Sequence, residues 1–470
     1  MSELVAESEG RRPRIAFLSF SRGEYDARTF RMAKSAVDAG WQVTVYARWH
    51  RGLAPVEERD GYRVVRAPRD WRYIVPGLRG IARRRYRAAM ARLPSSWPPS
   101  SASGADAGRR WRFRPLDRWH WWLRVREFPL RPMGWAVALD DVVEPADIWH
   151  GMWAGSLPAL ARMRRRHGGR TIYDSRDIFM KSRSFARLGR PGRSVLEWVE
   201  RRWAREADRV LTVNDSYADL IATLLRVPRP EVVMNCRERW TPPSPRPDRI
   251  REALGLLPET SVVLYQGILT MERGIEESME AILQVPSAVL VLMGFGAMTD
   301  ELAESVSKPP YQGRVYLLPP VPPEDLLVWS ASADALVMAI QPTTLNHQYT
   351  TPQKLFESMA AGVPVVASDL PGMATIVRET GAGVLCDPTS PASIAAAIES
   401  IVSASPAERR AMRERALRAT HDRYNWEAQL GTLFRLYREL LPAGLTMPEA
   451  EDLRPLLDPA PDRVSRSPAP

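Results

Sequence analysis

The 470-residue sequence predicts an α/β protein made of two doubly wound domains that face a cleft. Three observations lead to this prediction. Short apolar segments of strand length alternate with helix-like segments in two successive series. A proline-rich stretch at residues 241–247 separates the two series and is expected to form a stiff linker. The chain is also longer than a domain with a single hydrophobic core usually is.

The first series predicts an N-terminal domain over residues 14–240. An apolar strand at 14–20 and a turn-rich loop precede a helical pattern that ends at Gly40, and a second strand covers 42–47. This order is that of a βαβ unit, in which the two strands are parallel. Three more strands are expected, at 148–150, 170–173 and 209–213.

The second series predicts a C-terminal domain over residues 248–415. Its expected strands lie at 262–265, 289–292, 314–317, 335–338 and 364–367. Ligands of doubly wound sheets bind beyond the carboxyl ends of the strands, so a site in the cleft is expected. Residues 1–13 and 442–470 are predicted to be disordered.

Residues 71–135 interrupt the first series and are interpreted as an insertion, disordered around 94–108. They hold fifteen arginines, three acidic residues and seven tryptophans. These side chains suit either an anchor on an anionic membrane surface or a buried aromatic cluster that packs on the first domain. The anchor would use Trp111, Trp119, Trp121 and Trp122 with Arg109, Arg110, Arg112, Arg114, Arg118, Arg124 and Arg126.

The formal charge of +11 is unevenly distributed. Residues 1–240 carry 47 Lys and Arg against 27 Asp and Glu, whereas the remaining residues carry 19 against 28. A basic half joined to an acidic half suggests two units that face different partners. No recognised nucleic-acid-binding module accompanies the arginines, so no nucleic-acid partner is expected.

Cysteine content and hydropathy limit the class of protein further. Cys236 and Cys386 are far apart, which argues against a disulfide framework or a zinc site. The first residues lack a signal-peptide pattern, and no apolar run reaches the length of a membrane span. The expected location is the cytoplasm, with peripheral binding to the inner face of the membrane as a further option.

The segment 351–368 is the most informative part of the sequence. Thr351 is expected to cap a helix whose first residue is Pro352. The helix carries Glu357 and ends at Gly362, and a buried strand follows. The free N–H groups and the dipole at a helix N-terminus favour phosphate, and Glu357 can accept hydrogen bonds from ligand hydroxyls.

This segment resembles the signature of the retaining glycosyltransferase group 1 family, which has the GT-B fold of two Rossmann-like domains and uses nucleotide-sugar donors. The matching residues are Lys354, Leu355, Glu357, Met359, Ala360, Gly362, Pro364, Val365, Val366 and Ala367. The resemblance implies that a C-terminal helix, residues 416–441, packs back on the N-terminal domain.

Two further segments support the resemblance. Residues 264–274 are similar to the family's strand and glycine element, in which a basic residue, here Arg273, meets the donor diphosphate. Residues 291–296 are similar to the glycine turn beside the nucleoside. The donor-binding residues that the resemblance implies are Gly267, Arg273, Gly294, Gly296, Tyr349, Thr351, Lys354 and Glu357.

The sequence departs from the family pattern at several positions. Tyr349 stands where the family has the first glutamate of its Glu-x7-Glu pair, and Arg176 stands where it has a histidine. Either the protein runs the same chemistry with adapted residues, or it has lost efficient transfer. The catalytic residues implied are Arg273, Arg176, Asp177 and His150, although His150 also fits a histidine that is satisfied at a strand end.

The resemblance implies a glycosyltransferase that moves a sugar from a nucleoside-diphosphate donor to a hydroxyl, with retention. The acceptor would be a glycan or a lipid-linked molecule, in cell-surface polysaccharide or glycolipid synthesis. No metal and no cofactor are expected beyond the nucleotide sugar as co-substrate. The alternatives are a non-transferase GT-B enzyme, such as a nucleotide-sugar epimerase, and a catalytically weak scaffold that binds nucleotide sugars.

Overall fold

The computed structural model describes residues 11–24, 26–91, 126–181 and 190–442, together with residues 444, 445, 447 and 456. Internal contacts divide the chain into two compact units. The described residues up to Val233 and from Leu430 onward form the N-terminal unit, and Met234–Gln429 form the C-terminal unit. The predicted α/β class with two parallel sheets is confirmed.

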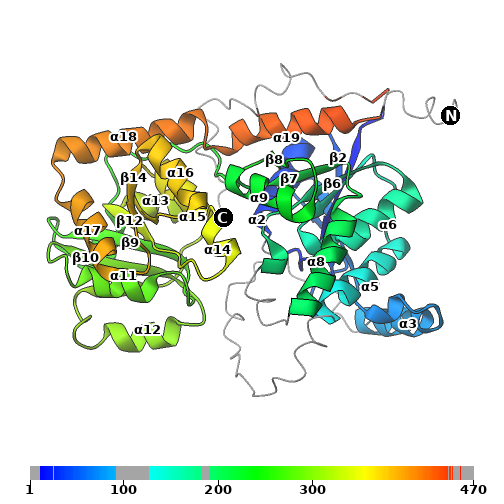
Figure 1. The fold of residues 1–470 in the computed structure, drawn as a ribbon, viewed down its shortest axis with the longest axis horizontal. Coiled ribbons are helices and arrows are strands. Elements are labelled where there is room, and N and C mark those ends of the chain that lie inside the picture. Colours follow the sequence, from blue (N-terminus) through cyan, green and yellow to red (C-terminus); the bar gives the residue numbers. More distant parts are fainter. Residues whose placement is uncertain are drawn as a thin grey trace. The chain divides into compact units, whose positions relative to one another are not determined.

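The N-terminal unit is built on an eight-stranded sheet with the order β3-β4-β2-β1-β5-β6-β7-β8. All neighbouring strands are parallel except β3, which pairs antiparallel with β4. Figure 1 shows this sheet enclosed among helices. The strands are β1 (Arg14–Ser19), β2 (Gln42–Arg48), β3 (Val56–Arg59), β4 (Tyr62–Ala67), β5 (Ile148–Met152), β6 (Arg170–Asp174), β7 (Arg209–Thr212) and β8 (Glu231–Val232).

The helices of this unit follow the βαβ rhythm that the sequence predicts. The α-helices are α2 (Ala27–Asp38), α3 (Arg79–Met90), α5 (Arg131–Ala138), α6 (Leu157–His167), α8 (Arg190–Ala204) and α9 (Asp215–Leu225). Short helical turns are η1 (Trp71–Tyr73), η2 (Pro76–Leu78), η3 (Arg126–Leu130), η4 (Leu139–Asp141), η5 (Ala154–Ser156) and η6 (Phe179–Lys181).

The C-terminal unit has a six-stranded, all-parallel sheet with the order β11-β10-β9-β12-β13-β14. Its strands are nearly continuous apolar runs because helices cover them (Figure 1). They are β9 (Ser261–Ile268), β10 (Ala288–Phe295), β11 (Val315–Leu318), β12 (Ala335–Met338), β13 (Val365–Ser368) and β14 (Gly383–Cys386). The helices are α10 (Arg249–Leu254), α11 (Ile275–Ile282), α12 (Thr299–Val306), α13 (Leu326–Ala331), α14 (Leu345–Tyr349), α15 (Gln353–Ala360), α16 (Pro371–Thr380), α17 (Pro391–Val402) and α18 (Pro406–Asp422).

The boundary between the units differs from the predicted linker at 241–247. The division falls at Met234, so the proline-rich stretch belongs to the C-terminal unit. Arg246 holds it there, because its Nε donates to the carbonyl oxygen of Ala331 at 2.7 Å and its guanidinium pairs with Asp334 at 3.3 Å.

The segment predicted as one helix over 416–441 is two helices, α18 and α19 (Trp426–Leu440). Asn425 separates them, because its side-chain oxygen accepts the backbone N–H of Ala428 at 2.7 Å and so caps the start of α19. From Leu430 onward α19 belongs to the N-terminal unit, where Tyr437 is buried with its ring centre 5.6 Å from that of Trp41.

The predicted insertion at 71–135 is described only at its two ends. Trp135 on α5 is fully buried, and its Nε1 donates to the carbonyl oxygen of Ala47 at 3.1 Å, so this part packs on the sheet. The low-complexity stretch and the tryptophans assigned to a membrane anchor lie outside the described residues. Within the described ranges, no helix has both the length and the apolar content to cross a membrane.

Candidate functional site

A cavity of about 460 Å³ opens in the C-terminal unit at the carboxyl ends of β9 and β10, beside the start of α15. It lies next to the point where the strand order reverses, between β9 and β12, which is where open α/β sheets bind ligands. The lining residues are Tyr265, Gln266, Gly267, Ile268, Arg273, Met293, Gly294, Phe295, Pro320, Val321, Leu326, Pro352, Gln353, Lys354 and Glu357.

Two glycines let the ends of β9 and β10 approach each other closely. Gly294 has a φ of 156°, and a Cβ built on it would lie 1.9 Å from the carbonyl oxygen of Gly267. A side chain at this position is therefore excluded by backbone. The strand ends present bare backbone to the cavity, which is the arrangement that allows a ligand close access.

Arg273 and Lys354 place two cations on the cavity wall. The Nζ of Lys354 lies 3.9 Å from the ring centre of Tyr265, a cation–π contact. Burial, followed by the neighbouring charge of Arg273, lowers the pKa of Lys354 to about 7, although Glu357 acts in the opposite direction. Two cations that repel each other in a cavity are both stabilised when an anion binds between them.

Glu357 is held in place by two amide side chains. Gln266 Nε2 donates to Glu357 Oε2 at 2.9 Å, and Gln353 Nε2 donates to Glu357 Oε1 at 2.9 Å. Ser330 in turn donates to Gln266 Oε1 at 2.6 Å, and Asn235 donates to Gln353 Oε1 at 3.2 Å. The carboxylate is thus oriented by hydrogen bonds and keeps lone pairs for further donors.

The helix that carries Glu357 starts one residue later than predicted. Its first residue is Gln353, and Pro352 is the N-cap with φ −71° and ψ 143°. The prediction that Thr351 caps this helix was wrong, because its hydroxyl donates to the carbonyl oxygen of Gly372 at 2.7 Å. The first turn of α15 still lines the cavity, so its free N–H groups are available to an anion.

Five of the predicted donor-binding residues line this cavity, namely Gly267, Arg273, Gly294, Lys354 and Glu357. Gly296, Tyr349 and Thr351 are not lining residues. Gly296 supports the turn into α12, where its N–H donates to Thr299 Oγ1 at 2.9 Å. Tyr349 is the last residue of α14, and its backbone packs tightly against Gly372.

The N-terminal unit has a polar network at the carboxyl ends of β5 and β6. Arg28 Nε donates to Asp174 Oδ2 at 2.7 Å, and both side chains are buried. His150 lies beside this pair, with its Nε2 4.0 Å from Asp174 Oδ2, and its Nδ1 is 2.9 Å from the hydroxyl of Tyr437. Burial, more than any neighbouring charge, lowers the pKa of His150 to about 4.

His150 is fully inaccessible in this arrangement. Its Nδ1 has a hydrogen-bond partner, but its buried Nε2 has none among the described residues, so the alternative of a satisfied strand-end histidine is met only in part. The catalytic role of His150 stays a prediction. Arg176 forms an ion pair with Asp26 at 2.7 Å, and the carboxylate of Asp26 also accepts a hydrogen bond from the hydroxyl of Ser19. Asp177 follows it on an exposed loop position.

Sequence reasoning missed the residues that orient the others. Gln266 and Gln353 lie within the two family-like segments but are not among the residues singled out there, and Arg28 lies in neither. Only the tertiary fold shows that each of the three meets a carboxylate. Their signal in the sequence is limited to a polar residue within an otherwise apolar strand or helix face. In the described part of the chain, no group of three or more His, Cys, Asp or Glu side chains is placed to hold a metal ion.

Solved structures share this architecture over nearly the whole chain. Sucrose-phosphate synthase from Thermosynechococcus elongatus aligns with a TM-score of 0.67, at 19% identity, over 91% of this chain and 99% of that chain. The Anabaena protein HepE in complex with UDP-glucose aligns with a TM-score of 0.58, at 14% identity, over 91% of this chain and 100% of that chain. The fold is therefore GT-B.

Sequence comparison places part of the C-terminal unit beside a known family. Residues 247–419 match the model of the family described as glycosyl transferases group 1. The D-inositol 3-phosphate glycosyltransferase of Corynebacterium urealyticum is 30% identical over 227 residues, which is 45% of this chain and 50% of that protein. The chain spans about half the length of the curated relatives it matches. The family resemblance seen in the sequence is confirmed.

Proposed function

We propose that the protein is a glycosyltransferase that moves a sugar from a nucleoside-diphosphate donor to a hydroxyl acceptor, with retention and without a metal ion. The observation that carries the proposal is the combination of Arg273, Lys354 and Glu357 in one cavity at the strand ends of the C-terminal unit. Two cations suit a diphosphate, and an oriented carboxylate suits the hydroxyls of a ribose.

The proposed chemistry is electrostatic. As the bond between sugar and diphosphate breaks, negative charge develops on the leaving group. Arg273, Lys354 and the first turn of α15 would stabilise this charge, because they are fixed before the reaction begins. The acceptor hydroxyl would attack from the face that the diphosphate leaves, which gives retention.

The donor is proposed to be a UDP-sugar, on the support of HepE, whose complex contains UDP-glucose. The acceptor is proposed to be a glycan or a lipid-linked molecule used in cell-surface polysaccharide or glycolipid synthesis. Arg176 and Asp177 are proposed to serve the reacting sugar, and Tyr349 to replace the first glutamate of the family pair. Binding to the inner face of the membrane through the Arg/Trp-rich insertion stays a prediction.

A turnover assay tests this proposal. Release of nucleoside diphosphate is measured for a panel of nucleotide sugars, with and without extracted lipid-linked and glycan acceptors. We expect release that depends on acceptor, resists a chelator and is lost in Arg273→Gln. The anomeric configuration of the product, read by NMR, checks retention.

Other outcomes favour the alternatives. A change in the sugar of the donor without any acceptor would indicate an epimerase-like enzyme. Binding of nucleotide sugars without turnover, in the presence of all extracted acceptors, would indicate a scaffold.

A further inference from the structure

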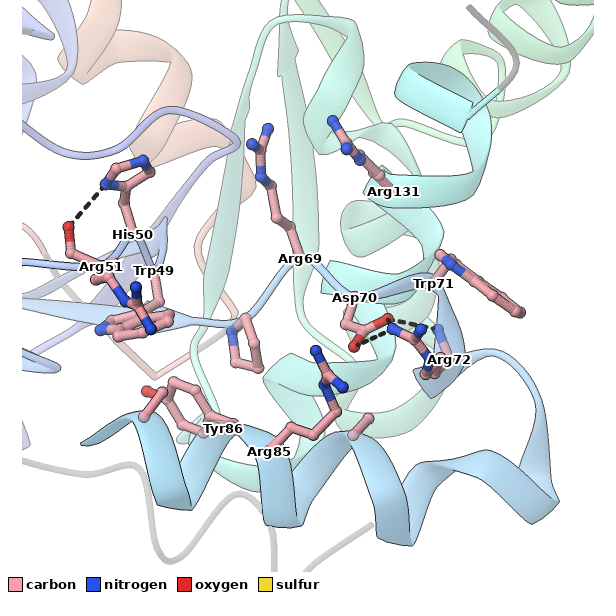
Figure 2. A pocket seen from close by; sticks show the side chains of 13 residues that line it. Trp49, His50, Arg51, Arg69, Asp70, Trp71, Arg72, Arg85, Tyr86 and Arg131 are labelled. Atoms are coloured by element: carbon pink, nitrogen blue, oxygen red, sulfur yellow. Dashed lines mark hydrogen bonds and ion pairs between the residues drawn. The ribbon is translucent and has the colours of Figure 1, made fainter. Parts of the chain in front are cut away.

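A second large cavity lies in the N-terminal unit, and no motif of the sequence pointed to it. Its volume is about 470 Å³, within the range of small-molecule sites. Its walls come from the segments that follow β2 and β4, the turn η1, helix α3 and the first residue of α5 (Figure 2). We call it the arginine pocket, and its lining residues are Trp49, His50, Arg51, Pro68, Arg69, Asp70, Trp71, Arg72, Ala82, Arg85, Tyr86, Ala89 and Arg131.

The lining of the arginine pocket is strongly cationic. Five of its residues are arginines and one, Asp70, is acidic. Asp70 is committed to Arg72, because its carboxylate accepts from the Arg72 guanidinium at 3.2 Å and from the Arg72 backbone N–H at 3.0 Å. Figure 2 shows Arg85 projecting from α3 toward the segment that carries Asp70. Arg69 and Arg131 extend on the other side of that segment.

The concentration of like charge affects a neighbouring arginine. Burial, followed by the charges of Arg69, Arg22 and Arg131, lowers the pKa of Arg48 to about 10. The Nε of Arg48 is buried and has no hydrogen-bond partner among the described residues. Cations that repel each other around a cavity create a field that attracts an anion.

The aromatic part of the wall is fixed before any ligand binds. The rings of Trp49 and Tyr86 meet edge to face, with centres 5.3 Å apart. Trp49 Nε1 donates to the carbonyl oxygen of Leu53 at 3.0 Å, and the Tyr86 hydroxyl donates to that of Arg66 at 3.1 Å. Aromatic faces beside guanidinium groups suit a ligand with an organic body and a phosphate.

We propose that the arginine pocket binds the phosphate or diphosphate group of a ligand other than the nucleotide-sugar donor. Guanidinium groups from three different segments, represented by Arg69, Arg85 and Arg131, line this one cavity, and a guanidinium is a group whose planar fork of donors matches phosphate oxygens. This ligand would be the phosphorylated acceptor of the transfer reaction, an assignment that rests on the proposed function. The binding of phosphate in the arginine pocket is independent of the proposed function.

Calorimetric titration with inorganic pyrophosphate tests the binding. The full chain carries Arg273→Gln, so that the cavity of the C-terminal unit contributes little. In this background Arg85→Gln and Arg131→Gln should each weaken pyrophosphate binding about tenfold or more. Arg85→Lys, which keeps the charge but loses the paired donors, should retain part of the affinity.

Arg84→Gln is the matched control. Arg84 precedes Arg85 on the same exposed helix and is not a lining residue. If Arg84→Gln and Arg85→Gln weaken pyrophosphate binding equally, the effect comes from the loss of a positive charge anywhere on the helix, and the proposal is overturned. Unchanged affinity in both Arg85→Gln and Arg131→Gln would also overturn it. Because Arg85 is exposed, its replacement should leave the melting temperature unchanged.

Further arms of the experiment separate two sources of the phosphate. Glucose 1-phosphate represents a free ligand, and vesicles of phosphatidic acid in phosphatidylcholine represent a lipid headgroup. If glucose 1-phosphate or the vesicles bind and Arg85→Gln abolishes that binding, the proposal is supported and the source of the phosphate is identified. If none of the probes binds, the proposal is overturned. Nucleoside-diphosphate binding that depends on Arg273 is measured separately, so that failure of the proposed function and failure of the pocket are distinguishable.

Discussion

The side-chain amide of Gln266 donates a 2.9 Å hydrogen bond to the carboxylate of Glu357, which joins the end of β9 to the second turn of α15. Gln266 is 2% exposed and Glu357 is 6% exposed. A carboxylate at this depth needs donors, and the strand supplies one of them.

Replacing Gln266 should therefore destabilise the C-terminal unit. Gln266→Met keeps the side-chain volume but leaves one oxygen of Glu357 without this donor, at an expected cost of about 1–3 kcal/mol. The midpoint of urea unfolding, followed by circular dichroism, measures the change. Gln284→Met, at an exposed position of the same unit, is the control and should change the midpoint little. Equal midpoints for the two variants would mean that the hydrogen bond contributes nothing.

Substitutions of Arg273 and of Glu357 should weaken the binding of different parts of the donor, the diphosphate and the nucleoside. Arg273→Gln is expected to weaken nucleoside-diphosphate binding about tenfold or more and to leave nucleoside binding unchanged, because its partner is phosphate. Glu357→Gln is expected to weaken both ligands by the same factor, because its partner is a ribose hydroxyl. Titrations followed by NMR measure both affinities. An effect of Arg273→Gln on the nucleoside alone would contradict the assignment of its role.

Donor binding should depend on pH through Lys354. Its pKa is about 7 in the free protein, because of burial and of Arg273, and a bound diphosphate should raise this pKa. The complex then holds a proton that the free protein loses, so affinity is fully present below about pH 7 and falls as pH rises toward the pKa of the complex.

Calorimetry in buffers of different ionisation enthalpy measures this proton uptake. Lys354→Met is the control, since the phosphate of the ligand titrates equally in both proteins. The slope of affinity against pH should be shallower in Lys354→Met. Identical slopes would exclude Lys354 as the titrating group.

Gly294→Ala should disrupt the junction of β9 and β10. The added Cβ would lie 1.9 Å from the carbonyl oxygen of Gly267, so backbone must move, with an expected loss of about 1–3 kcal/mol in stability. Nucleotide binding should fall as well, because the moved backbone lines the cavity. Gly77→Ala, where a Cβ meets nothing within 4 Å, should be nearly neutral in thermal unfolding. A fully stable Gly294→Ala would show that the strand ends can separate freely.

The ion pair of Arg28 and Asp174 should contribute far more than an exposed pair of the same unit. Asp174→Asn leaves a buried guanidinium unpaired, with an expected cost of about 3–5 kcal/mol. Asp38→Asn removes the partner of Lys34 on the surface of α2 and should cost about 0.5 kcal/mol or less. Thermal unfolding of both variants measures the difference. Similar melting temperatures would mean that water reaches Arg28 in the native state.

Much of the fold could be predicted because apolar segments have to alternate with amphipathic helices to bury two parallel sheets. The strands β1, β2, β9 and β12 begin and end within about three residues of their predicted bounds. The hairpin of β3 and β4 was missed because its residues mix charged and apolar side chains. β14 was missed because it begins at Gly383, which leaves a run of only three apolar residues.

Local patterns in the sequence were enough to predict the fold class, since spacing along a strand or helix fixes which side chains share a face. The resemblance of two segments to a known family, and not spacing, implied that Arg273, Lys354 and Glu357 belong to one site, and all three line the cavity of the C-terminal unit. The three-dimensional arrangement was needed to show that Gln266 orients Glu357, that His150 is buried beside Arg28 and Asp174, and that scattered arginines line one pocket. Hydrogen bonds and charge clusters between distant segments depend on how the chain closes on itself, and no local pattern records that closure.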